Sequence, residues 1–522
     1  MATVHPLAAE AAIGVLDAGG NAIDAAIAAV FAVGVVRPSM CGIGGGGFLV
    51  YRSANGRTAA LDFRETAPSR YSYSAGDPFG TGHETAGVPG VVAGMAAARK
   101  RFGTMPLRKL IAPAERLARE GFPVSPELSQ DIATNATRLR AFPAAADVYL
   151  IEGEIPYPPG MTLVHPDYSK SLRLIAREGP RAFYEGKIAD LLIAEMKASG
   201  RSTMRARDLA GYRAIWRRPL IGRYRGHRII GMPPPTSGGV AVMEMLNILE
   251  GFDLEAAGQS SADHLHYLAE AQKIAWADRA AYLGDPDFVD VPTAWLISKS
   301  YAAVRRAEIE RDQAKTYAPG ARPGRSTPPQ TVSEARPESH TTHVSVIDAQ
   351  GNAVAVTCTI EQIFGSAVVA PGTGFLLNNE LTDFDYAPNH PEAGKRPRSS
   401  MSPTIVARGG DAILSVGGAG GACIIMGVLQ AIVNTIDFGL DVGAAVDAER
   451  VDAECFFADM GMEDARVSPI AQQELEARGH TVQREGEYYI TPIVEAVGHD
   501  PDTGEVAAFS DPRSEWGSAA QP

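Results

Sequence analysis

The segment from residue 341 to residue 360 constrains the fold of this 522-residue chain more than any other. Residues 341–347 and 353–360 alternate between polar and apolar side chains, which is typical of strands, and residues 348–352 form a turn sequence. The apolar residues of both runs have even numbers, and strands that share a buried face must pair positions of the same parity. A three-residue loop then sets Val344 opposite Val356 and Thr341 opposite Thr359. We therefore predict a pair of hydroxyl groups at the start of a hairpin. Threonine is a good strand former, so the hairpin alone favours a structural role for this pair.

The hairpin follows the clearest linker of the chain, residues 318–338. This stretch holds five prolines and two glycines among polar residues, a composition that forms no regular element. Before it, residues 7–36 have the apolar spacing of two packed helices, and residues 86–280 predict a mainly helical lobe with one helix over 262–282. From residue 341 onward, short strands and tight turns are expected.

Composition argues against several classes of protein. The 61 acidic residues outnumber the 48 basic ones, which disfavours binding to nucleic acid. The longest apolar run has twelve residues, 25–36, whereas a membrane-spanning helix needs about 20. No signal peptide is recognised, so the chain as it stands is expected to be cytoplasmic, with a trimmed or lost leader as the alternative. Four cysteines without Cys-x-x-Cys spacing argue against a zinc ribbon or a disulfide scaffold: Cys41, Cys358, Cys423 and Cys455.

Two motifs are set aside. The glycines at 42, 44 and 47 fit the dinucleotide-binding fingerprint, but they follow a helical stretch and open a strand, the reverse of that motif. Asp263, His264 and His266 are side-chain types that bind metals, but residues two apart on a helix point in different directions. We expect a helix cap at this position, and neither a metal nor a cofactor in the protein.

Several blocks of sequence carry a family resemblance. The run Thr-Thr-His-Val-Ser-Val-Ile-Asp at 341–348, followed by Gly-Asn-Ala-Val at 351–354, resembles the start of the small subunit of γ-glutamyltranspeptidases. Other blocks resemble the same family in the same order, namely residues 19–26, 42–48, 62–65, 233–239, 378–384, 399–403 and 511–513. Together they cover nearly the whole chain, which makes the resemblance more specific than any single motif.

The resemblance implies an N-terminal nucleophile hydrolase of the α/β class, a four-layer αββα sandwich with a mainly helical lobe. Residues 1–340, including the linker, would be the large subunit of a precursor, and residues 341–522 the small catalytic subunit of the same αββα unit. Self-cleavage between His340 and Thr341 would give parts of about 36 and 19 kDa from the 55.2 kDa chain. Thr341 would then be the nucleophile, because the free α-amine of an N-terminal threonine can act as its base. Thr359 would orient it, and the amides of Gly420 and Gly421 would stabilise the oxyanion.

The resemblance also assigns the residues that hold a γ-glutamyl group. Arg64 would bind the α-carboxylate, because a guanidinium binds a carboxylate in a bidentate manner. The hydroxyls of Ser399 and Ser400 would donate to the same carboxylate. At the other end of the amino acid, the α-ammonium would be held by Glu361, Glu380 and Asp383. The expected substrates are γ-glutamyl amides such as glutathione, with water, amino acids or peptides as acceptors.

The chain departs from the family in three places. Glu361 stands where many members have asparagine, and Cys423 follows the oxyanion glycines where a polar or basic residue is common. The loop 384–397 is shorter than in many members, which predicts an open cleft and looser acceptor specificity. Two alternatives stay open. One is an acylase of the same fold for a β-lactam side chain or poly-γ-glutamate, and the other is an unprocessed, inactive binding homologue.

Overall fold

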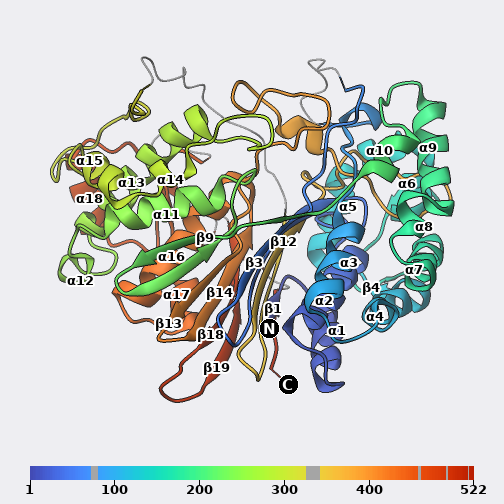
Figure 1. Ribbon diagram of the computed structural model, residues 1–522, viewed down its shortest axis with the longest axis horizontal. Helices are drawn as coiled ribbons and strands as arrows, with labels where there is room; N and C mark the ends of the chain where they lie inside the picture. The colour runs from blue at the N-terminus through green and yellow to red at the C-terminus, as the bar shows by residue number, and fades with distance from the viewer. Residues whose placement is uncertain (72–79, 325–340, 456–459, 489–491, 515–516, 522) are drawn as a thin grey trace.

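Two antiparallel sheets lie face to face at the centre of the molecule in the computed structural model (Figure 1). The structure describes residues 1–71, 80–324, 341–455, 460–488, 492–514 and 517–521. The first sheet has the strand order β20 (Ser518–Ala519), β1 (Ala2–Thr3), β11 (Thr342–Ile347), β12 (Ala353–Thr359), β2 (Gly46–Arg52), β3 (Thr58–Asp62) and β8 (Ile215–Arg217). The second has the order β19 (Val506–Ser510), β18 (Ile493–His499), β14 (Asp411–Ala419), β13 (Thr404–Arg408), β10 (His227–Gly231) and β9 (Leu220–Tyr224).

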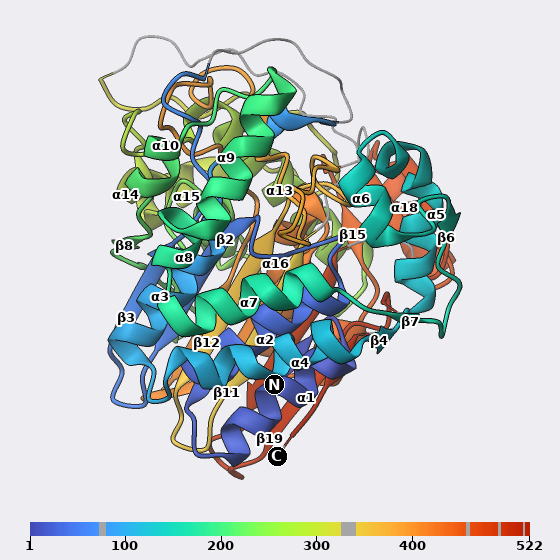
Figure 2. The same ribbon diagram turned by 90° about the vertical axis from the view of Figure 1, so that its right-hand side faces the viewer.

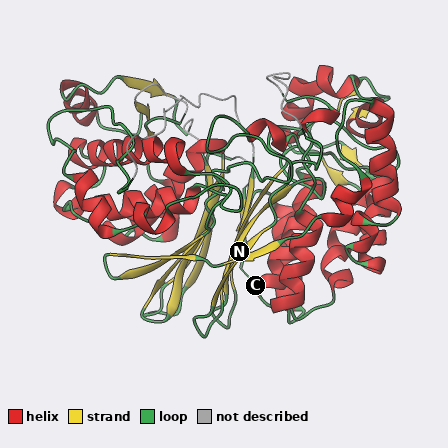
Figure 3. Ribbon diagram, turned by 45° about the horizontal axis from the view of Figure 1, so that its top comes forward, coloured by secondary structure: helices red, strands yellow, loops and turns green. Residues whose placement is uncertain are grey.

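Helices cover the outer face of each sheet, so the expected four-layer αββα sandwich is confirmed (Figures 1 and 3). Against the first sheet lie α1 (Pro6–Asp17), α2 (Ala22–Val36) and α3 (Val91–Phe102). Farther out, α4 (Leu107–Glu120) packs on α2 and α7 (Pro166–Glu178) packs on α4, and Figure 2 shows α2, α4 and α7 in front of β11 and β12. On the second lie α11 (Gly238–Leu249), α16 (Ile424–Asp437) and α17 (Val442–Asp447), with α13 (Ala262–Tyr282) and α15 (Lys299–Arg306) farther out.

Helix α2 explains the long apolar run of the sequence. Every residue of α2 is buried, because the helix packs between the first sheet and the helices α1 and α4. Asn21 caps its first turn by accepting a hydrogen bond from the backbone amide of Asp24. Within the described residues, none of the helices combines the length and the apolar character that crossing a membrane requires.

The expected helical lobe is interrupted. Helices α5 (Pro126–Arg140), α6 (Pro143–Tyr149), α8 (Arg181–Tyr184), α9 (Lys187–Ser199) and α10 (Ala206–Gly211) follow the expectation. The chain then enters both sheets through β8, β9 and β10 before it returns to helices at α11. Each sheet contains strands from before and from after residue 341, so the two parts of the chain share one pair of sheets. The smaller elements are β4 (Phe122–Pro123), β5 (Leu150–Ile151), β6 (Ile155–Pro156), β7 (Thr162–Leu163), α12 (Leu254–Ala257), α14 (Thr293–Leu296), β15 (Val451–Asp452), β16 (Met460–Glu463), α18 (Pro469–Ala477) and β17 (Val482–Glu485).

The hairpin has the predicted register. Val344 pairs with Val356 and Val346 with Val354, and these side chains pack in the core beneath α2. The opposite face of the hairpin is buried too, because it lies against the second sheet, where the hydroxyl of Ser415 lies 3.2 Å from that of Ser345. The polar face predicted from the sequence is therefore an internal polar layer between the two sheets.

The four cysteines form two disulfides, Cys41–Cys358 and Cys423–Cys455, with Cα–Cα distances of 6.0 and 5.3 Å. The sequence argued only against a disulfide scaffold and predicted neither pair. Local spacing could not reveal them, because the bonds join residues that are 317 and 32 positions apart in the sequence.

Candidate functional site

Thr341 immediately precedes the first residue of β11, and it is buried, with 3% of its surface exposed. The β11–β12 register pairs Thr342 with Cys358, so its continuation sets Thr341 opposite Thr359, as predicted. The Thr359 hydroxyl accepts a hydrogen bond from the backbone amide of Glu361 at 2.7 Å. His340, on the other side of the expected cleavage site, lies outside the described residues, as do residues 325–338 of the linker.

A buried histidine, His343, lies close to Thr341 on β11. His343 is two residues along on the same face of β11, and its ring contacts the Thr357 hydroxyl through Nδ1 at 2.7 Å and the Ser345 hydroxyl through Nε2 at 3.0 Å. Burial lowers the pKa of His343 to about 3, so the ring is neutral at physiological pH. Across the interface it lies directly against Gly417 of β14.

The glycine-rich turn after β14 lies between that strand and α16. Gly420 and Gly421 have φ angles of 132° and 59°, values that residues other than glycine rarely adopt. Among the described residues, neither backbone amide donates to a carbonyl. Backbone N–H groups of this kind are the donors that an oxyanion requires.

Arg64 lies behind β3 and is completely enclosed, with 1% exposure. Its guanidinium forms ion pairs with Glu380 and with Asp383, the latter at 2.5 Å, and it lies 3.8 Å from Glu65. Its Nε donates to the carbonyl of Pro397 at 3.3 Å. The sequence placed Arg64 and the two acidic residues at opposite ends of a bound amino acid, whereas the structure brings them into direct contact.

Three carboxyl groups, those of Glu65, Glu380 and Asp383, surround the single guanidinium of Arg64. Burial raises the pKa of Glu65 to about 7, even though Arg64 opposes the shift. Burial likewise raises the pKa of Glu380 well above its usual range, and the neighbouring Glu65, Asp383 and Glu361 add to this effect. A cationic group that entered this cluster would relieve the repulsion.

Glu361 is held in a strained backbone conformation, with φ of 81° and 4% exposure. For a residue other than glycine this conformation costs about 1–3 kcal/mol, and such strain is concentrated at functional sites. Its position next to Thr359 and near Glu380 joins the nucleophile end to the acidic cluster.

Ser399 and Ser400 lie on a loop that is fastened to the start of α11. The carbonyl of Ser399 accepts hydrogen bonds from the hydroxyls of Thr236 and Ser237 at 3.2 and 2.6 Å. The Ser400 hydroxyl accepts from Nη2 of Arg279 at 2.9 Å, so its proton can point elsewhere.

The short loop 384–397 folds back beneath the acidic cluster. Asn389 is fully buried and donates to the carbonyl of Asp383 at 2.7 Å, while its side-chain oxygen accepts from the amide of Arg398 at 2.8 Å. Tyr386, by contrast, is 68% exposed. The open cleft expected at this loop stays a prediction.

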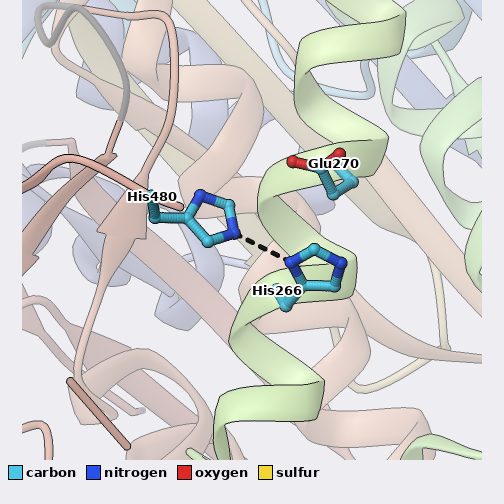
Figure 4. A group of neighbouring side chains, drawn as sticks. All are labelled: His266, Glu270 and His480. Carbon is cyan, nitrogen blue, oxygen red and sulfur yellow. Dashed lines mark hydrogen bonds between the residues drawn. The ribbon is translucent and has the colours of Figure 1, made fainter. Parts of the chain in front are cut away.

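A second polar cluster lies away from this site, between α13 and the segment after α18 (Figure 4). His266 Nε2 donates to the carbonyl of Glu310, so its Nδ1 accepts from Nε2 of His480 at 2.8 Å. Lys273 donates to Glu270 at 3.2 Å and reaches His480 Nδ1 at 3.5 Å. The lysine ammonium thus supplies the positive charge that a metal would otherwise bring, and we propose no metal here.

Two details of this cluster were missed in the sequence. The helix cap expected near Asp263 is made by Ser261, whose hydroxyl accepts from the amide of His264. The partner of His266 is 214 residues away in the sequence, beyond the reach of any spacing argument. The sequence likewise gave no role to Glu65 or Arg279. Only the position of Glu65 next to Arg64 could have indicated one.

Comparisons with known proteins place the chain in a family. The sequence model of the family described as gamma-glutamyltranspeptidase matches residues 8–521. The chain is 41% identical to a glutathione hydrolase proenzyme of Escherichia coli strain K12, over 98% of this chain and 90% of that protein. It is 43% identical to the acylase ACY 1 proenzyme of Pseudomonas sp. strain SE83, over 96% of this chain and 89% of that protein.

Among solved structures, the chain resembles a cephalosporin acylase from Bacillus halodurans, with a TM-score of 0.88 and 30% identity. That match covers 99% of this chain and 95% of the other.

Proposed function

We propose that this chain, which belongs to the gamma-glutamyltranspeptidase family, cleaves itself before Thr341 and then transfers or hydrolyses γ-glutamyl groups through that residue. Membership makes it an enzyme of the γ-glutamyltransferase and glutathione hydrolase type. The covalent γ-glutamyl-Thr341 intermediate is the finer part of the proposal. The observation that carries it is the register of β11 and β12, which sets Thr341 opposite Thr359 at the end of the inter-sheet space.

Processing would begin with attack of the Thr341 hydroxyl on the carbonyl of His340. The peptide C–N bond breaks as an ester forms, and the nitrogen of Thr341 takes up the proton that the hydroxyl loses. Water then hydrolyses the ester and leaves His340 with a carboxylate and Thr341 with a free hydroxyl and α-amine. In turnover that amine acts as the base.

In the enzymatic reaction the Thr341 hydroxyl would attack the γ-carbonyl of the substrate. The amides of Gly420 and Gly421 would stabilise the negative charge on the carbonyl oxygen, and Thr359 would keep the nucleophile in line. The amine leaves with the proton carried by the α-amine, and the γ-glutamyl ester is resolved by water or by the amino group of an acceptor.

The acidic cluster supports recognition of a zwitterionic head. A substrate α-ammonium would pair with Glu361, Glu380 and Asp383, and this draws the latter two away from the guanidinium. Arg64 would then be free to bind the α-carboxylate with the hydroxyls of Ser399 and Ser400. A free amino acid end replaces the internal ion pairs with equivalent ones, which a neutral acyl group cannot do.

An intact-mass spectrum followed by a γ-glutamyl anilide assay tests the proposal. We expect two fragments of about 36 and 19 kDa, the smaller beginning at Thr341, and release of aniline that depends on them. A single uncut mass after long incubation would favour the unprocessed binding homologue and would remove the basis for every catalytic role named above.

The second candidate keeps the chemistry and changes the acyl group. It is favoured by the 43% identity to an acylase proenzyme and by the similarity to a cephalosporin acylase structure. Parallel assays with a γ-glutamyl anilide and a β-lactam carrying an acyl side chain discriminate the two. Faster turnover of the β-lactam would establish the acylase.

A further inference from the structure

We propose that the mature enzyme is a covalently linked heterodimer, in which the Cys41–Cys358 disulfide joins the large part to the small part. The inference rests on the proposed function, because it assumes cleavage between His340 and Thr341. Before cleavage the bond lies within one chain. After cleavage Cys41 belongs to residues 1–340 and Cys358 to residues 341–522, so the same bond becomes the one disulfide between the two products.

The positions of the two cysteines favour the bond. Their Cα atoms are 6.0 Å apart, within the 4.4–6.8 Å range usual for disulfides. Both side chains are fully buried in the hydrophobic core between the first sheet and its helices. The other two cysteines are paired with each other, at Cys423 and Cys455, so neither competes for Cys41 or Cys358.

The surrounding backbone holds the same two segments together. The amide of Ile360 donates to the carbonyl of Met40 at 3.1 Å, and that of Phe364 donates to Ser39 at 2.9 Å. Cys358 lies on β12, where it pairs with Thr342 of β11 on one side and with Gly47 of β2 on the other. The cross-link therefore lies at a joint that already connects the loop after α2 with the strand carrying Thr359.

Formation of the bond is an oxidation. Two thiols lose two protons and two electrons as the sulfur–sulfur bond forms, and a disulfide oxidant, for example oxidised glutathione, accepts them and becomes two thiols. Disulfides persist in oxidising compartments and are rare in the cytosol. The protein should therefore be produced under oxidising conditions for this test.

The consequence of the link is that the two products cannot diffuse apart. A linked pair reassembles as an intramolecular event, so its recovery does not depend on protein concentration. Recovery of activity after dilution from urea should be equal at high and low protein concentration for the linked enzyme. For Cys358→Ser it should fall as the protein is diluted.

The decisive experiment is denaturing gel electrophoresis of the processed, full-length protein. The protein is run with and without dithiothreitol, after its free thiols have been blocked with N-ethylmaleimide. We expect one species near 55 kDa without reductant and two, near 36 and 19 kDa, with it. Cys358→Ser should give two species under both conditions. The matched control is Cys423→Ser, which breaks the bond inside the small part and should behave like the wild type.

Each failure has its own signature. Two species without reductant in the wild type would overturn the cross-link and leave the proposed cleavage intact. One species under both conditions would overturn the cleavage, and with it the two-chain form of this proposal. Mass spectrometry of an unreduced digest does not depend on processing or on the folding of a variant. A peptide containing Cys41 joined to one containing Cys358 supports the bond, and both peptides alkylated separately would overturn it.

Discussion

Replacement of Gly417 by alanine should displace the ring of His343, which lies next to the candidate site on β11. A Cβ at position 417 would lie 2.2 Å from Cε1 and 2.3 Å from Nδ1 of that ring. The best separation of two unbonded carbon atoms is about 3.5–4.0 Å, so the ring would have to move by roughly 1–2 Å. The ring is fully buried and contacts the hydroxyls of Thr357 and Ser345, so a displacement of this size would break both contacts.

Two contributions set the magnitude. Overpacking of a core costs about 1–3 kcal/mol, and breaking the hydrogen bonds of a buried imidazole costs about another 1–3 kcal/mol. We therefore expect Gly417→Ala to lower the free energy of unfolding by about 2–6 kcal/mol, and kcat to fall because β14 leads directly into the turn at Gly420. Gly14→Ala is the matched control, since no atom lies within 4 Å of its Cβ, and it should stabilise helix α1 by about 0.5–1 kcal/mol.

Calorimetry or urea unfolding of each variant measures the effect, and a double mutant tests the cause. Because the clash requires both side chains, the combination of Gly417→Ala with His343→Ala should be about 1–3 kcal/mol less unstable than the sum of the single changes. Strict additivity of the two would refute the view that the ring and the glycine oppose each other across the sheets.

Three further predictions concern the nucleophile and the acidic cluster. Thr341→Ala should remain one inactive chain by mass spectrometry, since the hydroxyl that opens the peptide bond is gone; a cleaved, active variant would overturn the assignment. Arg64→Lys should raise KM for a γ-glutamyl anilide about 10- to 100-fold, equivalent to about 1.5–3 kcal/mol of charge-assisted contact, and should change KM less for a donor without an α-carboxylate. Equal changes for both donors would contradict the clamp. Glu65 has a pKa raised from 4.5 to about 7, so the native state keeps its proton where the unfolded chain has lost it, and stability falls as pH rises through that window. The gain in melting temperature from Glu65→Gln should therefore be larger at about pH 8 than at about pH 5, and a gain independent of pH would refute the shift.

The sequence predicted the hairpin in detail because its information is local. Alternation with a period of two, the parity of the valines and a three-residue loop together select one register, and the structure has that register. The helices over 6–36 and 262–282 were readable for the same reason. The ordered blocks along the chain indicated the family, and the family in turn predicted the four-layer sandwich.

The tertiary structure decided which of the candidate residues meet. Arg64 and Asp383 are 319 positions apart, Cys41 and Cys358 are 317 apart, and His266 and His480 are 214 apart. No periodicity extends over such distances, because these contacts depend on how the two sheets and their helices stack. By itself, the sequence therefore determined the hairpin of β11 and β12 and the nucleophile candidate. The close contact of Arg64 with Glu380 and Asp383, and the cross-link next to Thr359, depend on how the layers pack together.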